Sequence, residues 1–296
     1  MFSKRSYPLL PLRPQLNFMS YAKVMTEWVA PRLRCGLGNR LFQVMASQTA
    51  AQRLHKEPVF FLPRMSHYDH GSFDLVRRCF PALRLVETAD KWFEVEEEKD
   101  QRLPEFPSVF PGSVVTKGFY QHQDNLPPLA SSAWPVLPGS PHQERKAWAV
   151  HFRFGDYLVL PHYHISLGKY YKWTIQSKIP PKSHLVLFSD TPTKLPNIAK
   201  ELESLGYTTE IYENKDTLET LHAIASCSQG AICSNSTFAW WASYFLWKRW
   251  QRPSYFPDTW LQDQPTPKIL DLPFTQSIEL SQIPDLDTLK SFSYLA

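Results

Sequence analysis

Apolar strands alternate with amphipathic helices over the second half of this chain, and this alternation constrains the fold more than any other feature. Consecutive strands that are joined through helices form a parallel sheet with right-handed crossovers. The sequence therefore predicts an α/β fold with a doubly wound sheet, whose ligands bind at the carboxyl ends of the strands. The expected strands span 147–154, 184–189, 209–212 and 230–233, and the expected helices span 168–175, 198–205, 216–225 and 236–247.

The same pattern begins earlier, after a proline-rich lead. A strand followed by a glycine-containing turn, a helix and a second strand makes a β-α-β unit, which again implies parallel pairing. The segment 63–110 gives no clear pattern. The expected elements are a strand near 32–35, a turn at Gly36–Gly38, a helix at 39–54, a buried strand at 59–62 and a strand at 113–119.

A proline-rich segment separates the two alternating regions. Residues 121–146 contain five prolines and show no periodicity, which is typical of an interdomain linker. We therefore expect two Rossmann-like domains. The first domain is expected at 31–125 and the second at 147–296. An N-terminal extension at 1–30 precedes the first domain, and a linker at 126–146 joins the two.

Composition excludes several classes of protein. Hydrophobic residues make up 43% and charged residues 20% of the 296 positions, so a disordered chain is excluded. Lys and Arg (32) exceed Asp and Glu (28) by four, a surplus too small and too scattered for a nucleic-acid-binding protein. The four cysteines form no C-x-x-C pair, so neither a structural zinc site nor a disulfide framework is expected, and a reducing compartment is favoured.

The N-terminal segment lacks the apolar core of a secretion signal. Pro8, Pro11 and Pro14 interrupt its only apolar stretch. No apolar run approaches the roughly 20 residues that a membrane span needs. We therefore expect a cytoplasmic protein without a transmembrane segment. A transit peptide, a peripheral association with a membrane and the oligomeric state are left open.

Residues that can bind an anion follow four of the expected strands. The first group is Gly36, Gly38 and Asn39, which open a helix. Glycines allow a close approach of backbone and ligand, and a helix N-terminus offers free N–H groups with about half a positive charge. The structural alternative is a strand-to-helix turn that needs small residues. The motif is neither a P-loop nor a dinucleotide fingerprint.

The second group follows the strand at 147–154. Strand alternation places His151 and Arg153 on one face and Phe154 on the other. An arginine at a strand end can hold a diphosphate through bidentate contacts, and Asp156 can orient it or act as a base. The structural alternative is a buried histidine and an Asp–Arg ion pair that holds a turn.

The third and fourth groups end the strands at 184–189 and 230–233. Asp190 can accept hydrogen bonds from a guanine edge, or it can cap the helix that follows. Asn235, Ser236 and Thr237 bring an amide, hydroxyl groups and a helix start to one place, which is a potential anion site. The Asn-Ser-Thr sequence also matches a glycosylation sequon, but a strand–helix junction is a poor place for a glycan.

Together and in this order, these residues resemble the α-1,2-fucosyltransferases of glycosyltransferase family 11, over about 34–260. The resemblance implies a GT-B-like pair of Rossmann-type domains with a cleft between them. It also implies transfer of L-fucose from GDP-β-L-fucose, with inversion, to the 2-OH of a galactoside, without a metal ion or a cofactor. The expected partners are a nucleotide sugar and a glycan acceptor. The motifs are GLGNRLFQVMA (36–46), HFRFGDY (151–157), a tyrosine pair (170–171), FSD (188–190), SNSTFAWW (234–241) and PSYFPDTW (253–260).

The resemblance also assigns roles to residues. Phe154 stands where the family has a second arginine, and Arg40 stands where it has a glutamine. The acceptor's base is left open between Asp156, His151 and the leaving phosphate. Two alternatives remain: an inactive GDP- or glycan-binding module of the same fold, and a transferase for another nucleotide sugar. The expected catalytic residues are Arg153, Asp156 and His151, and the expected donor-binding residues are Gly36, Gly38, Asn39, Arg153, Asp190, Asn235, Ser236 and Thr237.

Overall fold

The computed structural model of the protein describes residues 27–61, 73–87, 91–107, 109–163, 167–213, 216–262, 264 and 266–284. Most of the N-terminal extension expected at 1–30 lies outside these ranges, as does the end of the expected second domain.

The first half of the chain forms a five-stranded sheet in the order β3-β2-β1-β5-β4. All of its neighbouring strands pair in parallel. The helices of this half are α1 (Leu37–Leu54) and α2 (Phe73–Cys79). The strands are β1 (Trp28–Pro31), β2 (Glu57–Phe61), β3 (Arg84–Val86), β4 (Trp92–Glu96) and β5 (Ser113–Lys117).

The second half forms a six-stranded sheet in the order β11-β10-β9-β6-β7-β8, and again every described pair is parallel. Counted within this half, that order is the 3-2-1-4-5-6 order of a Rossmann sheet, read from the opposite edge. The strands are β6 (Trp148–Phe152), β7 (His184–Ser189), β8 (Thr208–Ile211), β9 (Gly230–Ile232), β10 (Ser254–Pro257) and β11 (Thr275–Ile278).

Helices cover both faces of the second sheet. Val150 and Leu187 pack in one apolar cluster with α3 and α4, whereas Ala149 and Val186 pack in another with α5 and α6. Alternate residues of a strand point to opposite faces, so this division confirms the predicted doubly wound α/β class. The helices are α3 (Leu167–Lys178), α4 (Leu195–Ser204), α5 (Thr217–Ser226) and α6 (Thr237–Trp250).

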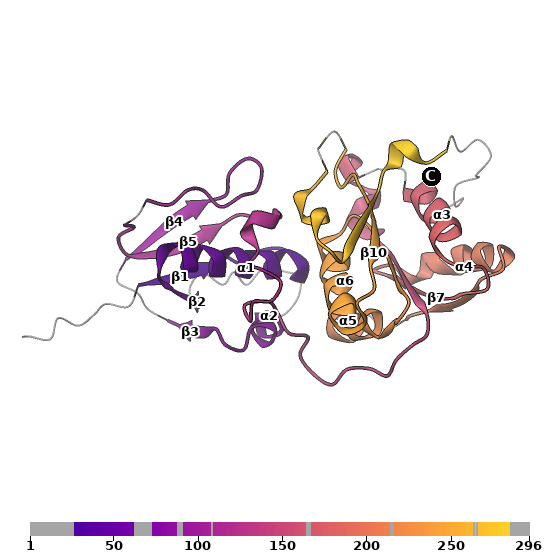
Figure 1. Ribbon diagram of the computed structural model, residues 1–296, viewed down its shortest axis with the longest axis horizontal. Helices are drawn as coiled ribbons and strands as arrows, with labels where there is room; N and C mark the ends of the chain where they lie inside the picture. The colour runs from indigo at the N-terminus through magenta and orange to yellow at the C-terminus, as the bar shows by residue number, and fades with distance from the viewer. Residues whose placement is uncertain are drawn as a thin grey trace, which may run out of the picture.

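An apolar core common to both halves joins α1 to α6 (Figure 1). The Phe42 ring of α1 lies 4.7 Å from the Trp240 ring and 5.0 Å from the Trp241 ring of α6, measured between centroids. Phe42, Trp240 and Trp241 are fully buried. Burying three large rings stabilises the contact by several kcal/mol, on the order of 2 kcal/mol for each side chain.

The proline-rich segment between the two sheets packs against this core. Trp134 is 5% exposed, and its ring stacks on Tyr244 of α6 at 4.7 Å between centroids. The Gln48 side chain of α1 donates a hydrogen bond to the carbonyl of Ala133. The segment is therefore attached to both halves rather than spanning them as a free tether.

The first strand lies earlier than its sequence pattern predicts. We expected it near 32–35, but β1 spans Trp28–Pro31 and α1 begins at Leu37. Cys35 has a φ of 62°, a left-handed conformation that no strand residue adopts. Residues 32–36 therefore form the loop that leads from the sheet to the helix.

Other elements had no clear sequence signal. The unassigned segment 63–110 contains α2, β3 and β4, and the second sheet gains two further strands, β10 and β11, after α6. The short strands β3 and β4 bury few side chains, so they leave little periodicity to detect.

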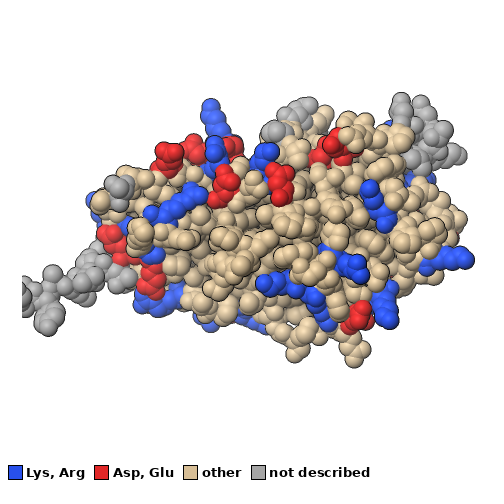
Figure 2. All heavy atoms as spheres, in the orientation of Figure 1, with Lys and Arg blue, Asp and Glu red and all other residues tan. Residues whose placement is uncertain are grey.

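Charges of both signs are interspersed over the face of the molecule in Figure 2, with a broad uncharged area between them. Within the described ranges, no helix combines the length and the apolar character needed to cross a bilayer.

Candidate functional site

The strand order reverses beside β1 in the first sheet and beside β6 in the second. Ligands of doubly wound sheets bind outside the carboxyl ends of the strands at such a switch point. In the second sheet the switch lies between β6 and β9, which pair through Val150 and Ile232. His151 lies near the carboxyl end of β6, and Ser234 follows β9 by two residues.

His151 and Ser234 meet across the switch point. The Nδ1 of His151 lies 3.0 Å from the Oγ of Ser234, and the hydroxyl of Tyr171 donates to the His151 carbonyl over 2.6 Å. Burial and, to a smaller extent, the nearby Arg153 charge together lower the pKa of His151 to about 3. His151 is therefore neutral at physiological pH. A base with so low a pKa takes a proton poorly at neutral pH.

Arg153 lies between two carboxylates. Its Nη2 is 2.7 Å from the Oδ1 of Asp156, and its Nη1 is 3.1 Å from the Oδ2 of Asp190. The Arg153 side chain is 32% exposed, as against 51% for Asp156 and 23% for Asp190. Two carboxylates and one guanidinium carry a formal charge of −1, so the arginine is held in place but its charge is already compensated.

Asp190 is fixed by the turn that follows β6. Its Oδ1 accepts a hydrogen bond from the Phe154 backbone N–H over 2.9 Å. A Cβ on Gly155 would lie 2.5 Å from the Asp190 Oδ2, so only glycine allows the carboxylate to approach this closely. Phe154 is fully buried and points into the core beside Phe152, away from Arg153, as strand alternation predicts.

Two stacked tyrosines connect Arg153 to the turn that follows β9. The Tyr157 ring stacks on Tyr163 at 4.1 Å between centroids, and the Arg153 guanidinium lies 5.5 Å from the Tyr157 centroid. The Tyr157 hydroxyl donates to the Asn235 carbonyl over 2.9 Å. Burial raises the pKa of Tyr163, and Asp156 and Cys35 raise it further.

The residues after β9 are buried. Asn235 is 1% exposed, and its Nδ2 donates to the carbonyl of Trp260 over 2.7 Å. Among the described residues, the Oδ1 of Asn235 has no hydrogen-bond partner. A buried acceptor without a donor is costly, so this oxygen is available to a ligand N–H or O–H. Ser236 is the N-cap residue of α6, and its side chain makes no capping hydrogen bond.

The glycine-rich motif brings the N-terminus of α1 against that of α6. A Cβ on Gly38 would lie 2.5 Å from the Thr237 carbonyl carbon, and the Trp241 Nε1 donates to the Gly38 carbonyl over 2.9 Å. Gly38 therefore allows close helix packing. Gly36 is the N-cap residue of α1, and a Cβ there would meet no atom of the described residues within 4 Å.

Asn39 joins three segments of the chain. Its Oδ1 accepts a hydrogen bond from the Thr237 hydroxyl and another from the Gln121 Nε2, each over 3.0 Å. Gln121 follows β5, which is the neighbour of β1 at the switch point of the first sheet. The ends of β1, β5 and β9 therefore meet around one amide oxygen.

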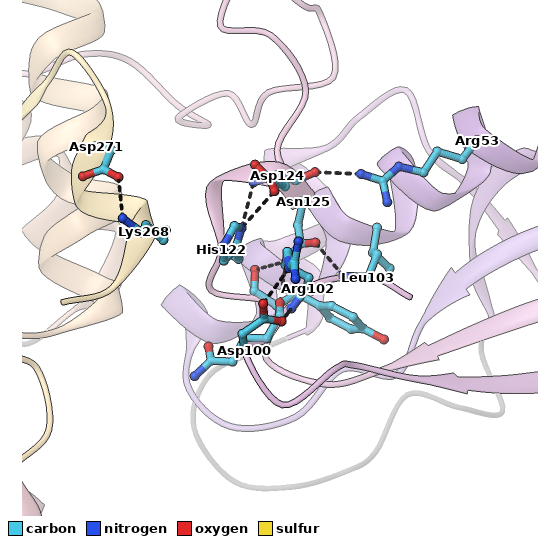
Figure 3. Close-up of polar contacts among 11 residues, drawn as sticks. Arg53, Asp100, Arg102, Leu103, His122, Asp124, Asn125, Lys268 and Asp271 are labelled. Atoms are coloured by element: carbon cyan, nitrogen blue, oxygen red, sulfur yellow. Dashed lines mark hydrogen bonds and ion pairs between the residues drawn. The ribbon is translucent and has the colours of Figure 1, made fainter. Parts of the chain in front are cut away.

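The sequence did not predict a role for Gln121, or for the buried residue that positions its loop. Asn125 is fully buried, and its Oδ1 accepts from the Leu103 N–H over 2.8 Å (Figure 3). Its Nδ2 donates to the carbonyls of Gln101 and Tyr120 over 2.6 and 2.9 Å. No local sequence pattern distinguishes a buried asparagine that holds a loop from any other asparagine in a proline-rich segment.

The structure thus groups the predicted residues into two neighbouring clusters. Arg153, Asp156 and Asp190 form one, and Gly38, Asn39 and Thr237 form the other. Ser234 and Asn235 connect them, because Ser234 contacts His151 and the Asn235 carbonyl contacts Tyr157. Gly36 and Ser236 cap the two facing helices. In the part of the chain that the structure describes, no group of three or more His, Cys, Asp or Glu residues is arranged to hold a metal ion.

No protein-family model and no curated protein matches the sequence. Similar solved structures include a mutant of Arabidopsis thaliana FUT1 in complex with GDP, at 12% identity over 74% of this chain and 68% of that chain, with a TM-score of 0.43. POFUT1 in complex with GDP is 13% identical over 78% and 98% of the two chains, with a TM-score of 0.48. Fucosyltransferase NodZ from Bradyrhizobium is 12% identical over 74% and 93%, with a TM-score of 0.44. Because these TM-scores are below 0.5, function has to be inferred from the residues of this chain.

Proposed function

We propose that this protein is a glycosyltransferase that transfers L-fucose from GDP-β-L-fucose, with inversion and without a metal ion, to the 2-OH of a galactoside. One observation carries the proposal: motif residues from four separate parts of the sequence lie at the carboxyl ends of β1, β6, β7 and β9. Contacts between Asn39 and Thr237, His151 and Ser234, and Arg153 and Asp190 connect these strand ends across the switch point.

The central chemical task is to stabilise a departing diphosphate. The bond between the fucose C1 and the β-phosphate oxygen breaks, a bond from C1 to the acceptor oxygen forms, and the acceptor hydroxyl loses its proton. Negative charge develops on the β-phosphate, so preorganised cations and N–H donors at that position lower the barrier. Arg153 is our candidate for this role, supported by the N-terminus of α6, which includes the Thr237 backbone N–H, and by the hydroxyl of Ser236.

The two carboxylates on Arg153 have different roles in this proposal. Asp190 is the less exposed one and is bound by the Phe154 N–H, so it keeps the guanidinium oriented. Asp156 is half exposed and gives way to the incoming diphosphate. Once displaced, Asp156 is a free carboxylate beside the reacting groups, and we assign it the proton of the acceptor hydroxyl. The guanine-edge role of Asp190 remains a prediction.

His151 acts as a positioning residue in this proposal. Its low pKa makes it a poor base, but its contact with Ser234 fixes the turn between β9 and α6. The unpartnered Oδ1 of Asn235 is our candidate acceptor for a polar hydrogen of the donor. Gly36, Gly38 and Asn39 contribute the N-terminus of α1 to the same region. No cofactor other than the donor is part of the proposal, and the cytoplasmic location also remains a prediction.

Direct binding and turnover measurements test the proposal. Isothermal titration with GDP and with UDP measures nucleotide preference, and incubation of GDP-fucose with lactose, with and without EDTA, measures transfer and its metal dependence. We expect GDP to bind more tightly than UDP, and a product whose linkage analysis shows fucose on the galactose 2-OH. Tighter binding of UDP, or transfer that EDTA abolishes, would contradict the proposal.

One structural observation favours a second candidate, an inactive GDP- or glycan-binding module. The only arginine of the HFRFGDY motif is neutralised by two carboxylates, and the position after it is a buried phenylalanine. This candidate predicts GDP binding without hydrolysis of GDP-fucose and without transfer to any galactoside.

A further inference from the structure

Three acidic side chains of β4 and of the residue that follows it have partners. Glu94 pairs with Arg32 at 3.3 Å, and Glu96 pairs with Lys117. The Oε2 of Glu97 accepts from the backbone N–H groups of Phe119 and Tyr120, each over 2.7 Å. Glu94, Glu96 and Glu97 are therefore engaged by cations or by backbone donors.

Arg34 is another cation at the carboxyl edge of the first sheet. The pKa of Glu96 is lowered mainly by its hydrogen bond to Lys117, and the charges of Arg34 and Arg32 lower it in the same direction. Within the described part of the chain, its guanidinium makes no ion pair, and its closest aromatic contact is the Phe119 ring, whose centroid lies 4.2 Å from Cζ. Its Nε is buried and has no hydrogen-bond acceptor among the described residues. An unsatisfied charged donor is costly, and stacking on an aromatic ring compensates only part of that cost.

A second buried donor lies on α1, against the loop that carries Arg34. Gln43 is 1% exposed, and its Oε1 accepts the backbone N–H of Arg34 over 2.9 Å. Its Nε2 has no acceptor among the described residues. The Gln43 Nε2 and the Arg34 Nε are therefore two buried donors without an acceptor among the described residues, on residues that contact each other at the β1 end of the first sheet.

The position of these donors indicates a ligand. Arg34 follows β1 and Phe119 follows β5, and these are the two strands at the switch point of the first sheet. Loops at a switch point are where an α/β sheet binds its ligand. A planar guanidinium favours a carboxylate, sulfate or phosphate, which it can bind through two parallel N–H···O contacts.

We propose that Arg34, stacked on Phe119 and supported by Gln43, binds an anionic group on the acceptor. This inference rests on the proposed glycosyltransferase function and narrows its substrate class to acidic glycans. Arg153 and the residues around it take the donor, whereas Arg34 selects an acceptor with a carboxylate, sulfate or phosphate near the hydroxyl that receives the sugar.

The test compares acceptors that differ in charge. The probes are lactose, two lactose monosulfates that leave the galactose 2-OH free, and galactose linked to glucuronic acid. Their binding is measured by NMR without any donor, on the wild type and on the Arg34→Gln, Arg34→Lys and Arg32→Gln variants. Arg32 is the matched control, because it lies two residues away on the same edge but already pairs with Glu94.

We expect the wild type to bind at least one anionic probe at least tenfold more tightly than lactose. Arg34→Gln removes this preference, Arg34→Lys restores part of it, and Arg32→Gln retains it. Equal binding of lactose and all three anionic probes by the wild type overturns the inference. If Arg34→Gln keeps the preference for the anionic probe, the inference is also overturned. An unchanged unfolding midpoint shows that each variant is folded.

Donor measurements on the same proteins separate the two proposals. GDP binding and hydrolysis of GDP-fucose are recorded for the wild type and for Arg34→Gln, and both are expected to be equal in the two proteins. If the wild type neither binds GDP nor hydrolyses GDP-fucose, the proposed function fails. The preference for anionic acceptors is measured without donor, so its result can be told apart from the result of the donor measurements.

Discussion

The hydroxyl of Thr237 donates a hydrogen bond to the Oδ1 of Asn39 over 3.0 Å, although 198 positions separate the two residues in the chain. Asn39 is in the first turn of α1 and Thr237 is the first residue of α6. The contact therefore fixes two helix N-termini against each other, and the positive ends of both helix dipoles lie close together.

The approach of these helices makes Gly38 intolerant of a side chain. Gly38→Ala places a Cβ 2.5 Å from the Thr237 carbonyl carbon, so the backbone of α6 has to move. Alanine would otherwise favour a helix by about 0.5–1 kcal/mol. We expect instead a loss of about 1–3 kcal/mol in the free energy of unfolding, measured by urea denaturation.

Gly36→Ala is the matched control for this prediction, because a Cβ there meets no atom of the described residues within 4 Å. Its free energy of unfolding should stay within about 1 kcal/mol of the wild type, the cost of alanine at an N-cap. Equal effects of the two substitutions would show that helix packing is not the reason for the glycine at position 38.

Arg153 is expected to be essential for turnover but not for folding. Arg153→Ala removes the candidate cation for the leaving diphosphate, so we expect kcat to fall by about 100-fold or more, equivalent to about 3 kcal/mol of transition-state stabilisation. The side chain is one-third exposed, so the unfolding midpoint should stay within a few degrees. Near-normal turnover of GDP-fucose would remove Arg153 from the mechanism.

Asp156→Asn distinguishes a simple ion-pair partner from a base. The substitution removes the carboxylate that a diphosphate has to displace from Arg153, so GDP should bind several-fold more tightly. Loss of a general base lowers kcat by about 10²–10⁴-fold. Titration calorimetry and initial rates on one preparation measure both effects, and a variant with tighter GDP binding but unchanged kcat would exclude Asp156 as the base.

Asp190→Asn provides the comparison. Asp190 orients Arg153 while it accepts the Phe154 N–H, so its loss should weaken GDP binding rather than strengthen it. If Asp156→Asn and Asp190→Asn changed the affinity for GDP in the same direction, the two carboxylates would not have the different roles that we propose.

His151 makes stability depend on pH. Its pKa is about 3 in the folded protein and near the ordinary 6.5 in the unfolded chain, so below pH 6.5 the unfolded state takes up a proton that the folded state excludes. Stability therefore falls as the pH drops from 6.5 towards 3. Between pH 7 and pH 5 this group costs about 2 kcal/mol.

His151→Gln removes this titration. Urea denaturation at several pH values should show a shallower loss of stability between pH 7 and pH 5 in the variant than in the wild type, whatever its stability at pH 7. Parallel pH profiles for the two proteins would mean that His151 is not excluded from protonation in the folded state.

The general architecture could be predicted because its signals are local. Strand β7 occupies 184–189 as expected, and helices α1, α5 and α6 lie within a few residues of their expected bounds. Alternation in a strand and a three-to-four spacing in a helix arise from backbone geometry, which neighbouring residues determine. The position of β1 was predicted wrongly because the segment before the glycine turn contains a proline and shows no alternation of apolar and polar residues.

The sequence by itself determined which polar residues end each strand, and the side to which Phe154 and Arg153 point, since alternation requires only the local backbone. Only the tertiary structure decided what those residues contact. Gly38 meets the backbone of α6, and Arg153 receives two carboxylates, one of them from the next strand of the sheet. Asn39, Gln121 and Thr237 meet because both sheets reverse their strand order beside the same helices. Such contacts depend on strand order and helix packing, which join segments that are far apart in the chain.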